Sequence, residues 1–533
     1  MPSTDAPASQ INVSVLDTTT LTQLGTSVIK GFNTTQVAQL SSDQLAVMSS
    51  SQLRALTTTQ IVAVTTTALS GLNTSAASGF SSTQVAAFRT TQIASLGSTG
   101  VSGFVTTAIK ALSSSQLAAL STDALDGLSA SQAAVLTSTQ IVGLSTIQLD
   151  SLDSQQVASF STTGLRGLTT VQVAAFDSDQ LSGLSSASVV AFTSSQVGAL
   201  ATDTLNGLST SLSGYLTSSQ IVGLTTVQSA ALSSTQLGAL NTAAVKGLLT
   251  SAVAKLSTDA LAGLTTAQAV ALGSTQLGSL TTEQVDVLTS VQVGALASSA
   301  IAGLTTRQAA VIDTDQVAGL TTLQVKAFSS SQLGALVSDT VAALTTSQLN
   351  VLTSSQIVGL DTTDVGALTS VQLGGLTTAA VRGLTTSQTV VLSSAQAVGL
   401  TSAGILALSS SQVAVLTTDA LNGLATSQTA YLTSVQLAGL TTVQAAALSS
   451  TQLGALNTSA VKGLATSAVA KFSTDALAGL STAQAVALGS TQLGSLTTDQ
   501  VDVLTSNQVG AFASSAIAGL TTRQAAILDT DQV

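Results

Sequence analysis

Residues 265–288 read TTAQAVALGSTQLGSLTTEQVDVL, which is three successive copies of one eight-residue pattern. The same frame runs from residue 9 to residue 528 without insertion or deletion and divides this part of the chain into 65 octads. Position 8 of the octad is Leu or Phe everywhere except at Met48, Val64 and Ile312, and all ten Phe lie there. So strict a period predicts one small unit stacked many times, and therefore a solenoid rather than a conventional globular domain.

Each octad has the residues of a short capped helix. Position 1 is nearly always Ser, Thr, Asn or Asp, and position 4 is Gln in 40 of the 65 octads. Together these two positions form the capping box that opens a helix. Positions 5 and 8, typically Val, Leu or Ile and then Leu, lie three residues apart and therefore on one helical face. Position 7 is mostly Ala or Gly, which allows another backbone to approach closely.

The charged residues follow the polarity of a helix. Eighteen of the 24 acidic residues occupy positions 1 or 3, and ten of the 13 basic residues occupy positions 6 or 7. Acids in the first turn and bases in the last turn complement a helix dipole, which a β-strand lacks. We therefore expect an all-α solenoid of about 65 very short capped helices, one per octad. Positions 5 and 8 should face inward and positions 3 and 6 outward. A β-solenoid is the alternative, because Thr and Val are good strand formers.

Octads that lack Gln at position 4 recur at regular distances. A spacing of 40 residues separates Ala300, Thr340, Ala380, Ala420 and Ala460, and Asp364 and Gly404 interleave with them. The mean step of 2.5 octads predicts one superhelical turn per roughly 20 residues. Duplication of a 40-residue gene segment would give the same spacing.

One repeat domain covers almost the whole chain. We expect residues 1–8 to be a disordered N-terminal segment and residues 9–533 to form one continuous solenoid. Within it, residues 225–320 recur nearly unchanged at 441–533, and the same offset relates Tyr215 to Tyr431. Length gained by copying suits a spacer or fibre better than an enzyme with a single active site.

The composition excludes several classes of function. The chain has no His and no Cys, so imidazole bases, thiolate nucleophiles, disulfides and the usual zinc sites are excluded. We therefore expect neither an enzyme nor catalytic residues. A net charge of −11 disfavours nucleic acid and anionic membrane surfaces as partners. No apolar run approaches the roughly 20 residues that cross a bilayer. The absence of Cys favours an extracellular location.

Asp-x-Asp pairs are the candidate metal ligands. Asp177 with Asp179, and Asp313 with Asp315, would each offer two of the oxygen ligands that Ca²⁺ prefers. The same residues also fit an N-cap followed by a first-turn acid. Because Ca²⁺ takes about six to eight ligands, capping is the preferred interpretation, and Ca²⁺ remains the one candidate cofactor.

The octads also resemble those of known proteins. SSSQLAAL (113–120) and TTDQVDVL (497–504) resemble the Ser/Thr/Gln/Leu arrays of very large secreted, adhesin-like proteins of proteobacteria. This resemblance implies a role in cell-surface attachment, biofilm matrix or filaments. TSSQIVGL (217–224) is similar to the first short helix of TAL-effector repeats. The second helix, base-reading loop and basic character of that family are absent, so DNA binding is not implied.

We therefore expect a non-enzymatic structural protein at the cell surface or outside the cell, as a filament, a biofilm-matrix component or an adhesin stalk. The alternative is a binding solenoid that recognises a glycan, a peptide or an ice surface. We expect self-association, end to end or lateral, because the last octads keep the interior consensus and the low charge gives little repulsion. A cell-surface or matrix polysaccharide is the other candidate partner.

Overall fold

The computed structural model describes residues 7–532, and every element in this range is a helix. Two 3-10 helices, η1 (Ala8–Gln10) and η2 (Val13–Val15), precede 64 α-helices that run from α1 (Thr18–Thr22) to α64 (Thr522–Ala525). The prediction of an all-α array is confirmed, and the β-solenoid alternative is wrong. Residues 1–6 of the expected disordered segment, and residue 533, lie outside the described residues.

The octad 9–16 is the exception to one α-helix per octad. It forms η2, because Asn12 stands at position 4 and its side chain accepts a hydrogen bond from the backbone N–H of Ser14 at 3.3 Å. The N-cap is therefore three residues later than in the other octads, and too few residues remain for an α-helical turn before the next octad.

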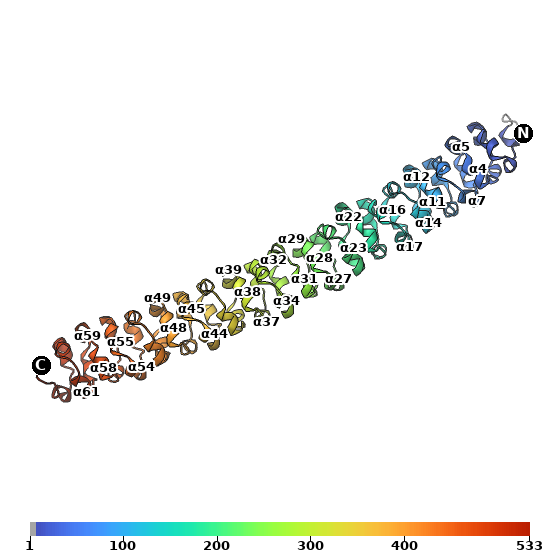
Figure 1. Ribbon diagram of the computed structural model, residues 1–533. Helices are drawn as coiled ribbons and strands as arrows, with labels where there is room; N and C mark the ends of the chain where they lie inside the picture. Colours follow the sequence, from blue (N-terminus) through green and yellow to red (C-terminus); the bar gives the residue numbers. More distant parts are fainter. Residues whose placement is uncertain (1–6, 533) are drawn as a thin grey trace. The chain divides into compact units, whose positions relative to one another are not determined.

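The helices fall into two units, Met1–Ala271 and Leu272–Val533. In each unit the short helices follow one another along an elongated coil, coloured blue to green in the first and yellow to red in the second (Figure 1). The octad frame is the same in both units.

The octad 81–88 shows how one unit folds. Helix α9 (Ser82–Ala87) begins at position 2. The Ser81 hydroxyl oxygen accepts from the backbone N–H of Gln84 at 3.3 Å, and Gln84 Oε1 accepts from the backbone N–H of Ser81 at 2.8 Å. These two bonds are the expected capping box. The helix ends at Phe88, whose φ of −58° and ψ of 141° lead the chain into the next octad.

The core is built from positions 5 and 8, as expected. In the octad 81–88, Val85 is 0% and Phe88 4% exposed. The Phe88 ring packs edge-on against Phe80 with 5.4 Å between centroids, and Phe80 also meets Phe104 at 6.5 Å. Position-8 side chains from the neighbouring octad and from three octads further along thus share one apolar column. Positions 3 and 6 lie outside this column, exposed or half-buried.

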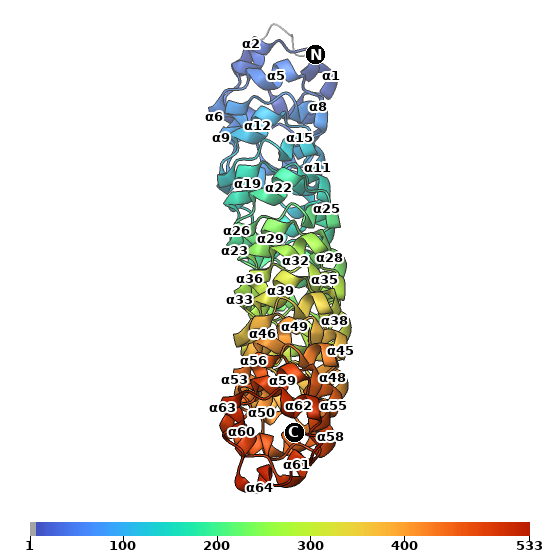
Figure 2. The same ribbon diagram turned by 90° about the vertical axis from the view of Figure 1, so that its left-hand side faces the viewer.

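Helices three octads apart lie side by side. α9 packs against α12 (Thr106–Ala111), and in the second unit α35 (Ser290–Ala295) packs against α38 (Thr314–Gly319). Figure 2 shows one such row in the second unit: α53 (Ser434–Leu437), α56 (Thr458–Val461), α59 (Thr482–Ala487) and α62 (Ser506–Gly510). The distance of three octads therefore sets the stacking of one turn on the next.

The position-4 glutamines join these turns. Gln156 is 1% exposed, and its Nε2 donates to the backbone oxygens of Leu125 at 3.0 Å and Leu128 at 2.7 Å, which lie 31 and 28 residues earlier. The same two offsets recur at Gln84, Gln268 and Gln388. Each buried amide thereby satisfies carbonyl groups at the end of the helix four octads before it.

The predicted turn of about 2.5 octads is wrong. Helices contact those three octads away, and glutamines reach carbonyls four octads away, so one turn takes between three and four octads. In several octads without Gln, other side chains bind the same carbonyls. Thr204 Oγ1 donates to the Phe176 oxygen at 2.8 Å, and Asn241 Nδ2 donates to the Leu216 oxygen at 2.8 Å.

At Gly127, which stands at position 7, the same stacking requires glycine. A Cβ atom on Gly127 would lie 2.5 Å from the backbone oxygen of Ser98, at position 2 three octads earlier. No L-residue fits this contact without displacing the neighbouring turn. The close approach expected at position 7 is therefore a contact between successive turns.

Candidate binding surface

The outer surface consists mainly of positions 1, 2, 3, 6 and 7 of the octads, with shallow grooves between helices three octads apart. One groove, of about 550 Å³, lies in the first unit over α19 (Thr162–Gly167), α22 (Ser186–Ala191) and the octad 209–216. It is lined by Thr162, Thr163, Arg166, Ser186, Ala187, Val190, Ala191 and Tyr215. A cation, an aromatic ring, hydroxyls and a small apolar floor are thus brought together from three turns.

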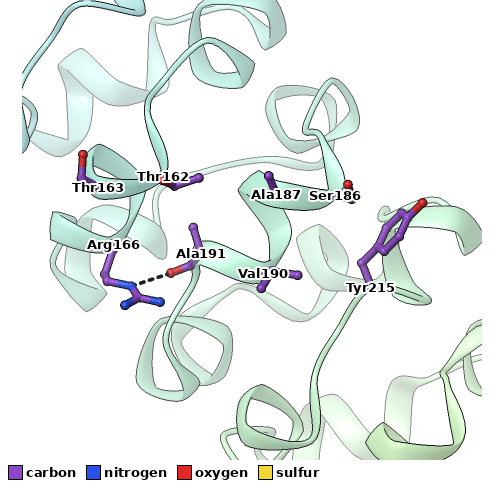
Figure 3. A pocket seen from close by; sticks show the side chains of 8 residues that line it. All are labelled: Thr162, Thr163, Arg166, Ser186, Ala187, Val190, Ala191 and Tyr215. Carbon is purple, nitrogen blue, oxygen red and sulfur yellow. Dashed lines mark hydrogen bonds between the residues drawn. The ribbon is translucent and has the colours of Figure 1, made fainter.

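Arg166 and Tyr215 lie on opposite sides of this groove, with Val190 and Ala191 of α22 between them (Figure 3). Arg166 Nε donates to the backbone oxygen of Ala191 at 3.4 Å, which holds the guanidinium at the rim. The Tyr215 side chain is 48% exposed. Ala191 beside it is only 5% exposed, whereas position-7 alanines elsewhere, such as Ala199, are half-buried.

The second unit has six of these eight residues at the offset that relates the two tyrosines, while Ala379 and Leu406 replace Thr163 and Val190. The counterparts of Thr162, Arg166, Ser186, Ala187, Ala191 and Tyr215 are Thr378, Arg382, Ser402, Ala403, Ala407 and Tyr431. Helix α46 (Thr378–Gly383) packs against α49 (Ser402–Ala407), as α19 packs against α22. Tyr431 is 46% and Ala407 6% exposed, which matches the first unit. Each of the two tyrosines thus stands three octads after a position-7 alanine that is nearly buried.

Other grooves have a cation but no aromatic ring. One of about 660 Å³ in the second unit is lined by Ser434, Val435 and Lys462, and one of about 420 Å³ in the first unit by Val227 and Lys255. These grooves follow from the octad geometry alone. The pair of arginine and tyrosine is what distinguishes the groove at Arg166.

Position 3 also places large apolar side chains in solvent. Each of the following is at least 65% exposed: Ile147, Val171, Val227, Val291, Leu323, Val371, Val435 and Val443. Ile147 and Val171 belong to α17 (Thr146–Asp150) and α20 (Thr170–Val173), which pack against each other. Their side chains therefore leave apolar surface exposed on neighbouring helices.

The candidate calcium ligands act as caps. Asp177 Oδ1 accepts from the backbone N–H of Gln180 at 2.8 Å, and Asp313 Oδ1 accepts from that of Gln316 at 2.7 Å. Asp179 and Asp315 lie in the first turns of the same helices, where the helix dipole favours a negative charge. Between residues 7 and 532, no three acidic side chains come together in an arrangement that could hold a metal ion.

Two exposed carboxyl groups titrate at a lower pH than usual. The backbone N–H of Thr20, which donates to Asp17 Oδ1 at 2.7 Å, holds the pKa of Asp17 below its ordinary value. The backbone N–H of Glu283 itself, followed by the Thr281 hydroxyl, lowers the pKa of Glu283. Both shifts come from hydrogen bonds at a helix N-terminus, so they belong to the capping of the octad rather than to a reactive site.

Sequence reasoning missed the groove of Arg166 and Tyr215. The shared offset of the two tyrosines was visible, and the same offset relates Arg166 to Arg382. What the sequence could not supply was the stacking of octads three apart, which brings positions 6 and 7 of different turns together.

Comparison with known proteins supports a repeat array. The chain is similar to the ALTTAQ repeat family in seven stretches, residues 109–146, 149–186, 173–210, 270–298, 310–346, 365–402 and 486–514. A search of curated proteins finds no match for the chain. None of the helices in residues 7–532 has the length and hydrophobicity that a membrane crossing requires.

Proposed function

We propose that this chain is a non-enzymatic structural repeat protein that works outside the cell, as a filament, a matrix component or the stalk of an adhesin. The observation that carries the proposal is the glutamine ladder, in which buried amides such as Gln156 and Gln388 bind backbone oxygens 28 and 31 residues earlier. The 40 octads with Gln at position 4 can repeat the same bonds between turns, so length can be added without changing the unit. This is the property that a spacer or fibre needs.

The chemistry of the side chains favours the same role. The chain offers many hydroxyls but no His and no Cys to activate them or to act in their place. We propose that it needs no cofactor, because the Asp pairs at Asp177 and Asp313 already serve as helix caps. The resemblance to secreted adhesin-like arrays supports the location.

Immunogold labelling of intact and permeabilised source cells tests this location. With an antibody against the octads, we expect gold particles on the surface of intact cells or on fibres around them. Labelling that appears only after permeabilisation would contradict the extracellular role.

We also propose that the chains associate laterally. The support is the exposed apolar surface at position 3, for example Ile147 at 71% and Val171 at 69% on neighbouring helices. Analytical ultracentrifugation over a concentration series should show association that the variant Ile147→Thr/Val171→Thr weakens. A wild-type chain that stays monomeric at the highest concentration would contradict this part of the proposal.

A further inference from the structure

We propose that the groove of Arg166 and Tyr215, and its counterpart at Arg382 and Tyr431, bind a pyranose ring that carries a carboxylate, as in a polyuronic acid chain. This binding activity goes beyond the structural role proposed above and does not depend on it. The inference rests on the chemistry of the groove, on the recurrence of its residues in the second unit, and on the openness of the site.

The tyrosine supplies a flat apolar face. Tyr215 and Tyr431 are about half exposed, at 48% and 46%, while all ten Phe of the chain stand at position 8, where the core lies. Between Tyr215 and Arg166 lie Val190 and Ala191, whose side chains give the groove an apolar floor with hydroxyls at its edges. A ring with an apolar body and a polar tip suits a sugar, whose C–H face is apolar and whose rim carries hydroxyls.

The arginine supplies the specificity for a carboxylate. Of the five N–H donors of Arg166, its Nε–H is used, in the bond to the Ala191 oxygen. That bond fixes the plane of the guanidinium at the rim of the groove (Figure 3). The structure gives Arg166 no ion pair with any acidic side chain of residues 7–532. A planar guanidinium with its terminal donors unused pairs with a carboxylate through two parallel hydrogen bonds.

The recurrence in the second unit argues against chance. The octads 145–152 and 361–368, which are related by the same offset as the two tyrosines, share only their second and last residues. At this offset the arginine, the tyrosine, the serine at Ser186 and Ser402, and the alanines are kept, while Val190 changes to Leu406 and Thr163 to Ala379. Position 6 is exposed and accepts Ala, Gly, Ser, Asp, Asn or Lys elsewhere, so stacking does not require arginine there.

The shape of the groove favours a polymer as the ligand. The groove is shallow and open, so it covers one face of a sugar and cannot bury a small molecule as an enclosed pocket does. A polysaccharide offers many such sugars, and repeated weak contacts add through multivalency. Peptides that bind by adding a strand to a sheet need a strand edge, and the described residues contain no strand.

Tyrosine fluorescence tests the proposal directly, because the chain has two Tyr and no Trp. Emission from the tyrosine band therefore reports on these two sites. The full chain is titrated with polygalacturonate and, as a matched ligand, with fully methyl-esterified polygalacturonate, which keeps the ring and loses the charge. We expect a saturable change with polygalacturonate, at least tenfold weaker apparent binding of the ester, and weakening by added salt.

Paired variants distinguish binding in the groove from general electrostatic attraction of the ligand. Arg166→Ala/Arg382→Ala should weaken binding at least tenfold while both tyrosines remain as reporters. Arg54→Ala is the control, because Arg54 Nε donates to the Gly79 oxygen at 3.3 Å from the same octad position, while Gly103 stands where the groove has Tyr215. Circular dichroism verifies that each variant is folded. No saturable change with polygalacturonate, equal binding of the ester, or an equal loss in Arg54→Ala would overturn the proposal.

Discussion

Replacing one ladder glutamine should loosen two turns at once. In Gln156→Leu the side chain keeps its approximate size but loses its amide. Gln156 Oε1 accepts from the backbone N–H of Asp153 at 2.8 Å, and Nε2 donates to the oxygens of Leu125 and Leu128 at 3.0 and 2.7 Å. The substitution removes these bonds from the octad of Gln156 and from the octad that ends at Leu128.

The expected loss of stability depends on which hydrogen bonds the former partners of Gln156 keep. The Leu125 oxygen keeps the backbone N–H of Leu128 at 3.0 Å, so it remains satisfied. The Leu128 oxygen and the Asp153 N–H lose the hydrogen bond that the structure gives them. A backbone group left without a partner costs about 1–3 kcal/mol, and the Asp153 end recovers part of this from water. We therefore expect a loss of about 2–4 kcal/mol in local stability.

Hydrogen exchange is the suitable assay, because long repeat arrays do not unfold in one cooperative step. A loss of about 2–4 kcal/mol speeds exchange by roughly 30- to 700-fold. The acceleration should appear in two separate peptides, one over residues 121–128 and one over residues 153–160. The control is Gln155→Leu, the same substitution at the neighbouring exposed position 3, which should change exchange little.

Two outcomes would refute the reasoning. Acceleration confined to residues 153–160 would mean that Gln156 acts only as a cap on its own helix. Equal effects of Gln156→Leu and Gln155→Leu would mean that the buried bonds to Leu125 and Leu128 contribute nothing measurable.

Three further predictions concern the turns and caps. Gly359→Ala should destabilise its turn by about 1–3 kcal/mol, because the new Cβ would meet the Ser330 backbone oxygen. Gly366→Ala, where nothing lies within 4 Å of the new Cβ, should stabilise its helix by about 0.5–1 kcal/mol. Hydrogen exchange that shows both variants stabilised, or both destabilised, would contradict this reasoning. Thr204→Val should cost about 1–3 kcal/mol by leaving the Phe176 oxygen without its donor, whereas the exposed Thr210→Val should be silent in the same assay. The pKa of Asp17 is lowered from 3.8, so the folded state binds a proton at this carboxylate less readily than the unfolded state. The stabilisation of the folded state by this cap is therefore present above pH 3.8 and is lost as the pH falls through the lowered pKa. An NMR titration in which Asp17 protonates at or above 3.8 would contradict this sign.

The local structure of the octad was predictable because local interactions decide it. The capping box of Ser81 and Gln84 and the inward face of Val85 and Phe88 require only residues within one octad. Helix propensity, capping and periodicity all agree at this level, so the prediction of short capped helices is confirmed.

The stacking distance was not predictable from the same pattern. It depends on contacts between octads, such as Gln156 with Leu128, in which the acceptor is a backbone oxygen and so is not identified by its residue type. The residue choice does hold a hint, since a capping box accepts Glu as readily as Gln, yet no octad has Glu at position 4. The need for an amide donor, which Glu lacks, explains that choice. For the same reason the groove of Arg166 and Tyr215 could not be assembled from sequence.

Engineered disulfides test the central claim, that successive turns meet at three octads. The chain has no cysteine, so a pair can be introduced without background reactions. A Cβ on Gly375 would lie 3.3 Å from the Cβ of Thr346, close to the separation of about 3.5–4.5 Å in disulfides. Under mild oxidation Thr346→Cys/Gly375→Cys should therefore crosslink within one chain and lose reactivity toward maleimide. Ser355→Cys/Gly375→Cys, whose spacing in the sequence matches a turn of 2.5 octads, should stay reduced. Crosslinking of the second pair and not of the first would contradict the account.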